Sequence, residues 1–159
     1  MEWKLRDVMD PVITDVAAEG RTKDEVLRAM AVRLLSGGYI SDLEQFVCDI
    51  YRREAAGPTG MGGCISIPHG KSSAVKKMGV AVARTKTPVR WESCAGEIGW
   101  QETRLVFLFC VLDDEAFADN HLSLLSQLAG KLGSAARIDR LLACQNAEEF
   151  LDVLLAEEE

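Results

Sequence analysis

The chemistry open to this chain depends first on its two histidines, because neutral imidazole is a competent nucleophile near neutral pH. His69 stands in the run Ile67-Pro68-His69-Gly70, directly after a short strand-like segment. The flanking proline and glycine predict a rigid turn that holds the ring exposed and oriented at a strand end. His69 is therefore the first candidate for a catalytic nucleophile.

A glycine-rich loop, residues 57–63 with the sequence GPTGMGG, precedes His69 along the chain. Backbone amides in such a loop can approach an anion because no side chains stand in the way. Thr59, Gly60 and Gly62 are therefore candidate phosphate-binding residues. A glycine-rich loop between a helix and a strand is more often simply a turn, and that interpretation stays open at this point.

The second histidine, His121, follows Asp119 and Asn120 at the predicted start of a long helix. Its ring would lie beside N-terminal backbone amides, which favour a bound anion and disfavour an imidazolium. The alternative role is a surface residue or a partial helix cap. Together, two histidines, a glycine-rich loop and a helix start are groups that can hold a phosphoryl group.

Motifs for nucleotides, metals and cofactors fail in this sequence. The segment Gly70-Lys71-Ser72 resembles the end of a P-loop, but the first glycine of that motif falls on Ile65, and a GxGxxG motif starting at Gly60 fails there too. Neither histidine has a cysteine or a second histidine at ligand spacing, so we expect no metal site and no cofactor. The five cysteines are predicted to be reduced thiols, and three of them lie in apolar stretches and are expected to be buried: Cys48, Cys64 and Cys110.

The composition predicts one globular domain over residues 1–159, with 48% hydrophobic residues. Eighteen Lys and Arg against 25 Asp and Glu give a net charge of −7, which argues against nucleic acid and anionic membrane surfaces as partners. The longest apolar run, Leu105–Leu112, is much shorter than the roughly 20 residues of a membrane-spanning helix. The first residues lack a signal-peptide pattern, so we expect a cytoplasmic protein without membrane insertion.

Helix boundaries follow from capping residues. Thr22 and Glu25 form a capping box that predicts a helix, and Gly37-Gly38 predicts its end. The apolar residues expected on the buried face of this helix are Val26, Leu27, Met30, Ala31, Leu34 and Leu35.

The same signal recurs in two further places. Ser41 with Glu44 predicts a second helix that ends near Ala56, and Asn146 with Glu149 predicts the last helix. Between them, the long helix after Asp119 is expected to bury one apolar side, made of Leu122, Leu125, Leu128, Ala129 and Leu132.

Strands are predicted in the middle of the chain, at Cys64–Ile67, Met78–Arg84 and Leu105–Leu112, the last of them buried on both faces. Val12–Val16 is a further candidate strand. The segment from Thr85 to Thr103 fits either a long irregular connection or a hairpin. Helices before and after a group of strands predict an α/β fold, with a mixed β-sheet sandwiched between helices on both faces.

Taken in order, these motifs resemble the enzyme IIA component of the fructose/mannitol type, from the bacterial phosphoenolpyruvate:sugar phosphotransferase system. The resemblance rests on Arg53-Glu54, Thr59–Gly62, Ile65–Gly70 and His121-Leu122-x-x-Leu125, and it extends from about Leu5 to the last helix. Two departures occur within it. Ser66 stands where the family usually has alanine, and Pro58 stands where serine often precedes the threonine.

The resemblance implies that His69 accepts a phosphoryl group from the carrier protein HPr, through Nε2, and passes it to a cysteine on a sugar-specific IIB domain. It implies that His121 is the second active-site histidine and that Arg53 lies near the phosphate. Met61, Ile67 and Met78 are candidates for a docking surface and equally for core residues.

Two functions follow from this resemblance, and the sequence leaves the choice between them open. One is a phosphocarrier in sugar uptake. The other is a regulatory, nitrogen-type IIA protein that signals its phosphorylation state by binding other proteins. The intact histidines argue against a third interpretation, a binding module that kept the fold and lost the transfer. The sugar cannot be identified, because a IIA component does not contact it.

Overall fold

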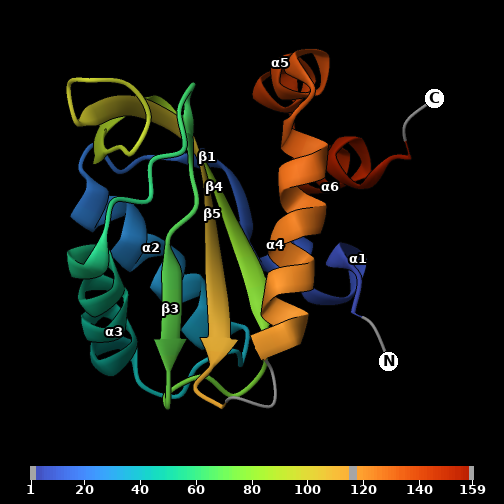
Figure 1. The fold of residues 1–159 in the computed structure, drawn as a ribbon. Helices are drawn as coiled ribbons and strands as arrows, with labels where there is room; N and C mark the ends of the chain where they lie inside the picture. Colours follow the sequence, from blue (N-terminus) through green and yellow to red (C-terminus); the bar gives the residue numbers. More distant parts are fainter. Residues whose placement is uncertain (1–2, 115–117, 158–159) are drawn as a thin grey trace.

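The computed structural model describes residues 3–114 and 118–157, and within them five strands form one mixed sheet in the order β1-β4-β5-β2, with β3 also paired to β5 (Figure 1). β1 pairs in parallel with β4, β4 pairs antiparallel with β5, and both β2 and β3 pair in parallel with β5. The strand bounds are β1 Thr14–Ala18, β2 Ile65–Ser66, β3 His69–Ser72, β4 Gly79–Glu92 and β5 Trp100–Leu112.

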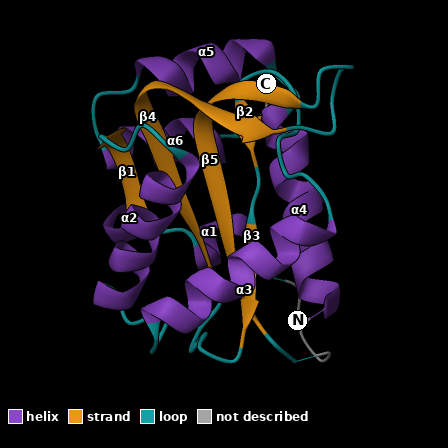
Figure 2. Ribbon diagram, turned by 90° about the vertical axis from the view of Figure 1, so that its left-hand side faces the viewer, coloured by secondary structure: helices purple, strands orange, loops and turns teal. Residues whose placement is uncertain are grey.

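Helices cover both faces of the sheet, which confirms the predicted fold class (Figures 1 and 2). The α2 and α3 helices pack on one face and contribute to one apolar core, while α1, α4, α5 and α6 pack on the other face around a second core. The helix bounds are α1 Leu5–Val8, a 3₁₀ turn η1 at Pro11–Ile13, α2 Lys23–Ser36, α3 Leu43–Ala56, α4 Ala118–Leu132, α5 Ala135–Ala143 and α6 Ala147–Leu155. No helix of this described part is long and apolar enough to cross a bilayer.

β2 and β3 are two pieces of one edge strand interrupted at Pro68. Ile65 pairs with Leu105 and His69 pairs with Phe109, so the register against β5 is the same before and after the interruption. Proline has no N–H to donate, and an edge strand tolerates it because one side lacks a neighbour. The Pro68 carbonyl still accepts a hydrogen bond from the Phe109 amide at 2.9 Å. The prediction that His69 lies exposed on a turn was therefore wrong: it begins a strand and is half-buried.

Strand alternation decides which way each residue of the edge strand faces. Ile65 and Ile67 belong to the core on the α4 side, as does Phe109, the partner of His69. Gly70 faces the opposite side, where the Phe46 ring of α3 lies so close that a Cβ would overlap it. The missing side chain thus lets α3 pack directly against the strand that carries His69 (Figure 2).

The segment from Thr85 to Thr103 is a hairpin. β4 and β5 continue their antiparallel pairing past a register shift, from Val89 opposite Thr103 to Glu92 opposite Trp100. Trp91 is fully buried on the α2 and α3 side, so the hairpin extends an apolar face rather than forming an irregular connection. The described structure therefore resolves the alternative that the sequence left open.

The capping predictions are confirmed at two helices and wrong at one. The Thr22 hydroxyl accepts from the Glu25 amide, and the Asn146 side chain accepts from the Glu149 amide. At α3 the cap is Asp42 rather than Ser41, because the aspartate carboxylate accepts from the amide three residues on, that of Gln45, at 3.1 Å.

The predicted burial of the long helix was partly wrong. α4 begins at Ala118, so His121 lies inside its first turn rather than at its start. Leu122 is 63% exposed and Ala129 is exposed, whereas Leu124, which the prediction omitted, is fully buried. The buried face is the i, i+4 row of Leu124, Leu128 and Leu132, with Leu125 partly buried beside it, so it differs from the predicted face at Leu122 and Ala129. The sequence analysis also missed the separate helix α5.

Smaller corrections concern single residues and one strand. Cys48 is exposed on α3 and Cys64 is half-buried, so of the three cysteines expected inside only Cys110 is buried. Leu35 on α2 is 42% exposed. The candidate strand at Val12–Val16 starts as the 3₁₀ turn η1 and becomes a strand only from Thr14.

The close packing at Gly70 leads to a stability prediction. Gly70→Ala should lower the free energy of unfolding by about 1–3 kcal/mol, because the new Cβ would overlap the Phe46 ring and approach Ile50 Cγ1 to 3.1 Å. Urea denaturation measures the change. As a matched control, Gly130→Ala in α4, where a Cβ meets nothing within 4 Å, should raise stability by up to about 1 kcal/mol. Equal effects of the two substitutions would contradict this account of the α3 packing.

Candidate functional site

The two histidines come together at the junction of the sheet edge and α4. The ring centroids of His69 and His121 lie 4.9 Å apart in an edge-on arrangement. The Phe109 ring of β5 contacts both, stacked on His69 at 5.1 Å and tilted against His121 at 5.4 Å. The phenyl ring thus forms the apolar base of the site, and β3 and α4 each contribute one histidine to it.

His69 is held neutral by its surroundings. Burial, together with the smaller effects of the positive charges of His121 and Arg53, lowers its pKa from 6.5 to about 4. Its Nδ1 atom is buried without a hydrogen-bond partner among the described residues, although the backbone of Ile67 lies close enough to oppose the pKa shift slightly. At neutral pH this ring is therefore an uncharged base, which is the nucleophilic form.

His121 has a related environment. Burial lowers its pKa, with further lowering by the positive charges of Lys71 and Arg53. Its Nε2 atom is buried and has no hydrogen-bond partner in the described chain. A buried ring nitrogen without a hydrogen-bond partner is energetically costly. Nε2 of His121 is therefore free to donate to an acceptor that reaches this site.

Two cationic residues influence the site electrostatically. Arg53, in the last turn of α3, is exposed and donates from Nη1 to the Gly57 carbonyl at 3.2 Å, and its charge lowers the pKa of both histidines. Lys71 is exposed on β3, two residues after His69, so strand alternation puts it on the same side of the sheet. The sequence analysis missed Lys71; alternation along the strand was the signal that could have found it.

The candidate phosphate-binding residues of the glycine-rich loop are already hydrogen-bonded inside the protein. The Gly60 amide donates to the Glu92 carbonyl at 2.9 Å, and the Gly62 amide donates to Gln101 Oε1 at 2.8 Å. The Thr59 hydroxyl donates to Glu54 at 2.9 Å. A direct role in phosphate binding therefore stays a prediction for all three, and it would require these bonds to be exchanged.

The loop is instead positioned by a buried network around Glu54. Lys23 Nζ lies 2.6 Å from Glu54 Oε1 and 2.6 Å from Glu92 Oε2. Burial alone would lower the pKa of Lys23, but the hydrogen bonds and charges of the two carboxylates outweigh it and raise that pKa. The Thr59 hydroxyl joins the network by accepting from Trp91 Nε1 at 2.9 Å. This network ties α2, α3, the loop and β4 together.

The loop in turn holds the strand that leads to His69. The Thr59 carbonyl accepts from the Ile67 amide at 2.9 Å, and Gly60 bridges Ser66 in antiparallel fashion. Ser66, the departure from the family pattern, is fully buried with its hydroxyl 2.7 Å from that of Thr103. The added hydroxyl therefore has a hydrogen-bond partner inside the sheet.

Of the three apolar residues considered for docking, only Met61 is available at the surface. Its side chain is 54% exposed, whereas Ile67 and Met78 are buried core residues. Leu122, adjacent to His121, is exposed as well. Two apolar side chains are therefore accessible to a partner, one on the glycine-rich loop and one on α4 beside His121.

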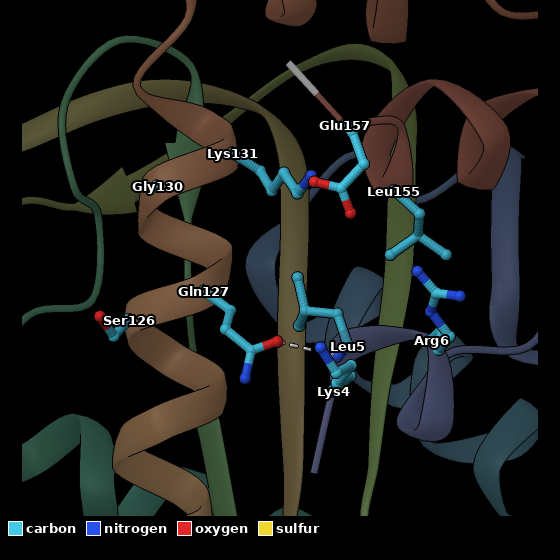
Figure 3. A pocket seen from close by; sticks show the side chains of 9 residues that line it. All are labelled: Lys4, Leu5, Arg6, Ser126, Gln127, Gly130, Lys131, Leu155 and Glu157. Atoms are coloured by element: carbon cyan, nitrogen blue, oxygen red, sulfur yellow. Dashed lines mark hydrogen bonds between the residues drawn. The ribbon is translucent and has the colours of Figure 1, made fainter. Parts of the chain in front are cut away.

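Two cavities lie elsewhere, beside the C-terminal half of α4. One, of about 550 Å³, lies among α1, α4 and the end of the chain; its lining residues are those drawn in Figure 3: Lys4, Leu5, Arg6, Ser126, Gln127, Gly130, Lys131, Leu155 and Glu157. Neither cavity is lined by any of the predicted site residues. Within residues 3–114 and 118–157, no three His, Cys, Asp or Glu side chains gather in a way that would hold a metal ion.

Comparisons with known proteins agree on one family. The family model described as "Phosphoenolpyruvate-dependent sugar phosphotransferase system, EIIA 2" matches residues 9–157. The chain is 35% identical over 133 residues to the "PTS system 2-O-alpha-mannosyl-D-glycerate-specific EIIABC component" of Escherichia coli, covering 84% of this chain but only 20% of that longer protein. It is 30% identical over 142 residues to the "Mannitol-specific phosphotransferase enzyme IIA component" of Halalkalibacterium halodurans, covering 87% of this chain and 88% of that one.

Solved structures show the same likeness in three dimensions. The nitrogen regulatory protein IIA-Ntr from Neisseria meningitidis superposes with a TM-score of 0.77 at 25% identity, covering 93% of this chain and 97% of that one. IIA mannitol from Escherichia coli, in a complex with phosphorylated IIB mannitol, has a TM-score of 0.74 at 26% identity and covers 92% and 98% of the two chains.

The burial of His69 predicts an unusual titration. Its ring should titrate near pH 4 instead of near 6.5, because burial disfavours the imidazolium. Long-range ¹H–¹⁵N NMR spectra follow both ring nitrogens through a pH series, and a His121→Gln sample assigns the signals. A midpoint for His69 near 6.5 would contradict the described environment.

The same shift predicts a pH dependence of stability. Between pH 6.5 and about 4 the unfolded chain binds a proton on residue 69 and the folded chain does not, so stability should fall as the pH falls through this window. In His69→Gln the group is absent, and the decline should be shallower by up to about 1.4 kcal/mol per pH unit. Urea denaturation at several pH values measures both slopes, and parallel slopes would count against a depressed pKa.

Proposed function

Because this chain belongs to the EIIA 2 family of the phosphoenolpyruvate-dependent sugar phosphotransferase system, we propose that it is a phosphocarrier with the phosphoryl group on His69. The observation that carries this proposal is the neutral, half-buried ring of His69, whose centroid lies 4.9 Å from that of the His121 ring. Burial of Nδ1 leaves Nε2 as the nitrogen that an incoming phosphoryl group reaches.

In the first step, HPr in its phosphohistidine form is the donor. The lone pair of His69 Nε2 attacks phosphorus, a P–N bond forms there, and the P–N bond to the donor breaks. His69 keeps its proton on Nδ1, so the transfer requires no proton acceptor at the nucleophile. Catalysis of such a loose transfer depends mainly on alignment and on stabilising charge on the equatorial oxygens. No cofactor takes part in this step.

The groups around His69 fit that requirement. His121 donates a hydrogen bond from its buried Nε2 to a phosphoryl oxygen, which supplies the missing partner of that atom. Arg53 and Lys71 provide positive charge at the exposed side of the site, where the phosphoryl oxygens would lie. Thr59, Gly60 and Gly62 act mainly by holding the loop in place, because their donors are engaged in the protein.

In the second step a cysteine thiolate of a IIB domain attacks the phosphorus, forming a P–S bond while the P–N bond to His69 breaks. The similar E. coli IIA mannitol was solved with phosphorylated IIB mannitol, which supports a IIB domain as the acceptor. Met61 on the glycine-rich loop and Leu122 beside His121 offer exposed apolar contacts for the partners. A chain that exchanges phosphoryl groups with HPr works in the cytoplasm, without inserting into a membrane.

A regulatory role is the second candidate, and the likeness to the nitrogen regulatory protein IIA-Ntr favours it. Both roles use the same phosphorylated histidine, so they differ in the donor and in what binds the product. Rates of phosphoryl acceptance from HPr and from nitrogen-type HPr, measured side by side, separate the two. A IIB domain that takes the phosphoryl group onward supports transport.

His69→Ala should abolish acceptance, because no other side chain at the site replaces the nucleophile. The measurement is the transfer of radiolabelled phosphoryl from phosphoenolpyruvate through enzyme I and HPr to the chain. Cys48→Ser, at an exposed position on α3, is the control and should label normally. Persistent labelling of His69→Ala would refute the assignment.

His121→Ala should still accept a phosphoryl group, more slowly, and should transfer it onward to a IIB cysteine poorly. The reason is that His121 contributes a donor to the transferring group rather than the nucleophile. Single-turnover transfer from the purified phosphorylated variant to a IIB domain measures this step. Onward rates equal to those of the parent chain would return His121 to a packing role.

A further inference from the structure

The side chain of Gln101, near the start of β5, joins three segments around the active-site strand. Its Oε1 accepts from the Gly62 amide at 2.8 Å, and its Nε2 donates to the Ile65 carbonyl at 2.8 Å and to the Thr103 hydroxyl at 3.0 Å. Both N–H groups and the carbonyl oxygen of the amide are thus engaged. Gln101 and its three partners, Gly62, Ile65 and Thr103, are together called the Gln101 clasp.

The surrounding residues are shaped to admit this side chain. A Cβ on Gly60 would lie 2.7 Å from the Glu92 carbonyl oxygen and 2.8 Å from the Gln101 amide group, so glycine at that position leaves room for both. Gly62 has a φ of +96°, a conformation that L side chains rarely adopt and that directs its amide to Gln101. Internal packing against Glu92 and Gln101 therefore accounts for both glycines of the loop.

The clasp continues into the sheet through a buried pair of hydroxyls. Thr103 accepts from Gln101, and its hydroxyl lies 2.7 Å from that of Ser66, both residues being fully buried. Ser66 is the departure from the family pattern noted in the sequence, and it adds one hydrogen bond to the clasp. The clasp therefore links the glycine-rich loop and β2 to β5.

From these contacts we propose that Gln101 is a positioning residue for phosphoryl transfer, which sets the place of His69 by clasping the glycine-rich loop to the strand that carries it. The path is short: Gln101 holds Gly62 and Ile65, and the Thr59 carbonyl of the same loop accepts from the Ile67 amide, two residues before His69. Displacement of reacting groups by about 1 Å can slow a reaction about a hundredfold. The expected effect on phosphoryl transfer rests on the proposed function. The expected effect on the position of His69 does not depend on it.

The decisive variant is Gln101→Leu, which keeps the size of the side chain and removes all three hydrogen bonds. It should slow phosphoryl acceptance from HPr, with enzyme I and phosphoenolpyruvate present, by about tenfold or more at saturating HPr. The titration midpoint of His69, followed by NMR, should move up from about 4 toward 6.5 as water reaches the ring. Exchange of the Gly62 amide hydrogen should accelerate.

A matched control exists at Gln127 in α4 (Figure 3). Its side chain makes a similar clasp, accepting from the Leu5 amide at 3.1 Å and donating to the Trp3 carbonyl at 2.9 Å and to the Ser123 hydroxyl at 3.3 Å. Gln127→Leu removes the same number of hydrogen bonds away from the loop. It should destabilise the fold to a similar extent while leaving the His69 midpoint unchanged and the acceptance rate within about twofold.

A milder variant covers the case in which Gln101→Leu does not fold. Thr103→Val removes the hydrogen bond from Gln101 and the one shared with Ser66, but it keeps the Gln101 bonds to Gly62 and Ile65. It should shift the same readouts in the same direction by a smaller amount. The proposal is overturned if folded Gln101→Leu or Thr103→Val leaves the midpoint and the acceptance rate unchanged, or if Gln127→Leu changes both as much. If the parent chain accepts no phosphoryl group from HPr, the proposed function fails, and the His69 midpoint and the Gly62 exchange still decide the role of Gln101.

Discussion

The pairing of one edge strand with β5 is the constraint on which the site depends. The register before and after Pro68 is the same, with Ile65 opposite Leu105 and His69 opposite Phe109. A shift by one residue would turn every side chain to the other face, so the imidazole would point toward α3 and away from His121. The lack of a side chain at Gly70 supports this register from the other face, where Phe46 takes the space. The geometry of the two histidines is thus a consequence of how the sheet is assembled.

In the proposed function, the half-buried His69 has to meet two opposing requirements. A nucleophilic imidazole must be neutral, and burial against Phe109 achieves this by lowering its pKa. A phosphorylated imidazole carries negative charge, which burial would disfavour unless cations were near. Arg53 and Lys71 satisfy this second requirement from exposed positions, so they add charge without filling the core. Arg53 also lowers the pKa of both histidines, and Lys71 lowers that of His121, so these cations favour the neutral rings before the phosphoryl group arrives.

The sequence predicted the parts of the molecule that depend on local signals, and missed those that depend on packing between distant segments. The caps at Thr22 and Asn146 and the layered α/β fold follow from short-range patterns and are confirmed. The Gln101 clasp joins residues nearly forty positions apart, and no local pattern signals such a contact. Burial of His69 was missed for a similar reason: a proline suggested the end of a strand, whereas pairing with β5 continues the strand beyond it. Local chemistry pointed to His69 as a nucleophile and to His121 as a group beside an anion, whereas the role of Arg53 came from the family resemblance alone.

The central claim is that burial of one ring nitrogen directs the phosphoryl group to the other. Long-range ¹H–¹⁵N NMR of the ¹⁵N-labelled chain, after phosphorylation by phosphoenolpyruvate, enzyme I and HPr, tests this at the level of single atoms. The account predicts that a single histidine changes, His69, with phosphorus coupled to Nε2 and the proton retained on Nδ1. Phosphorus on Nδ1 of His69, or on His121, would contradict it.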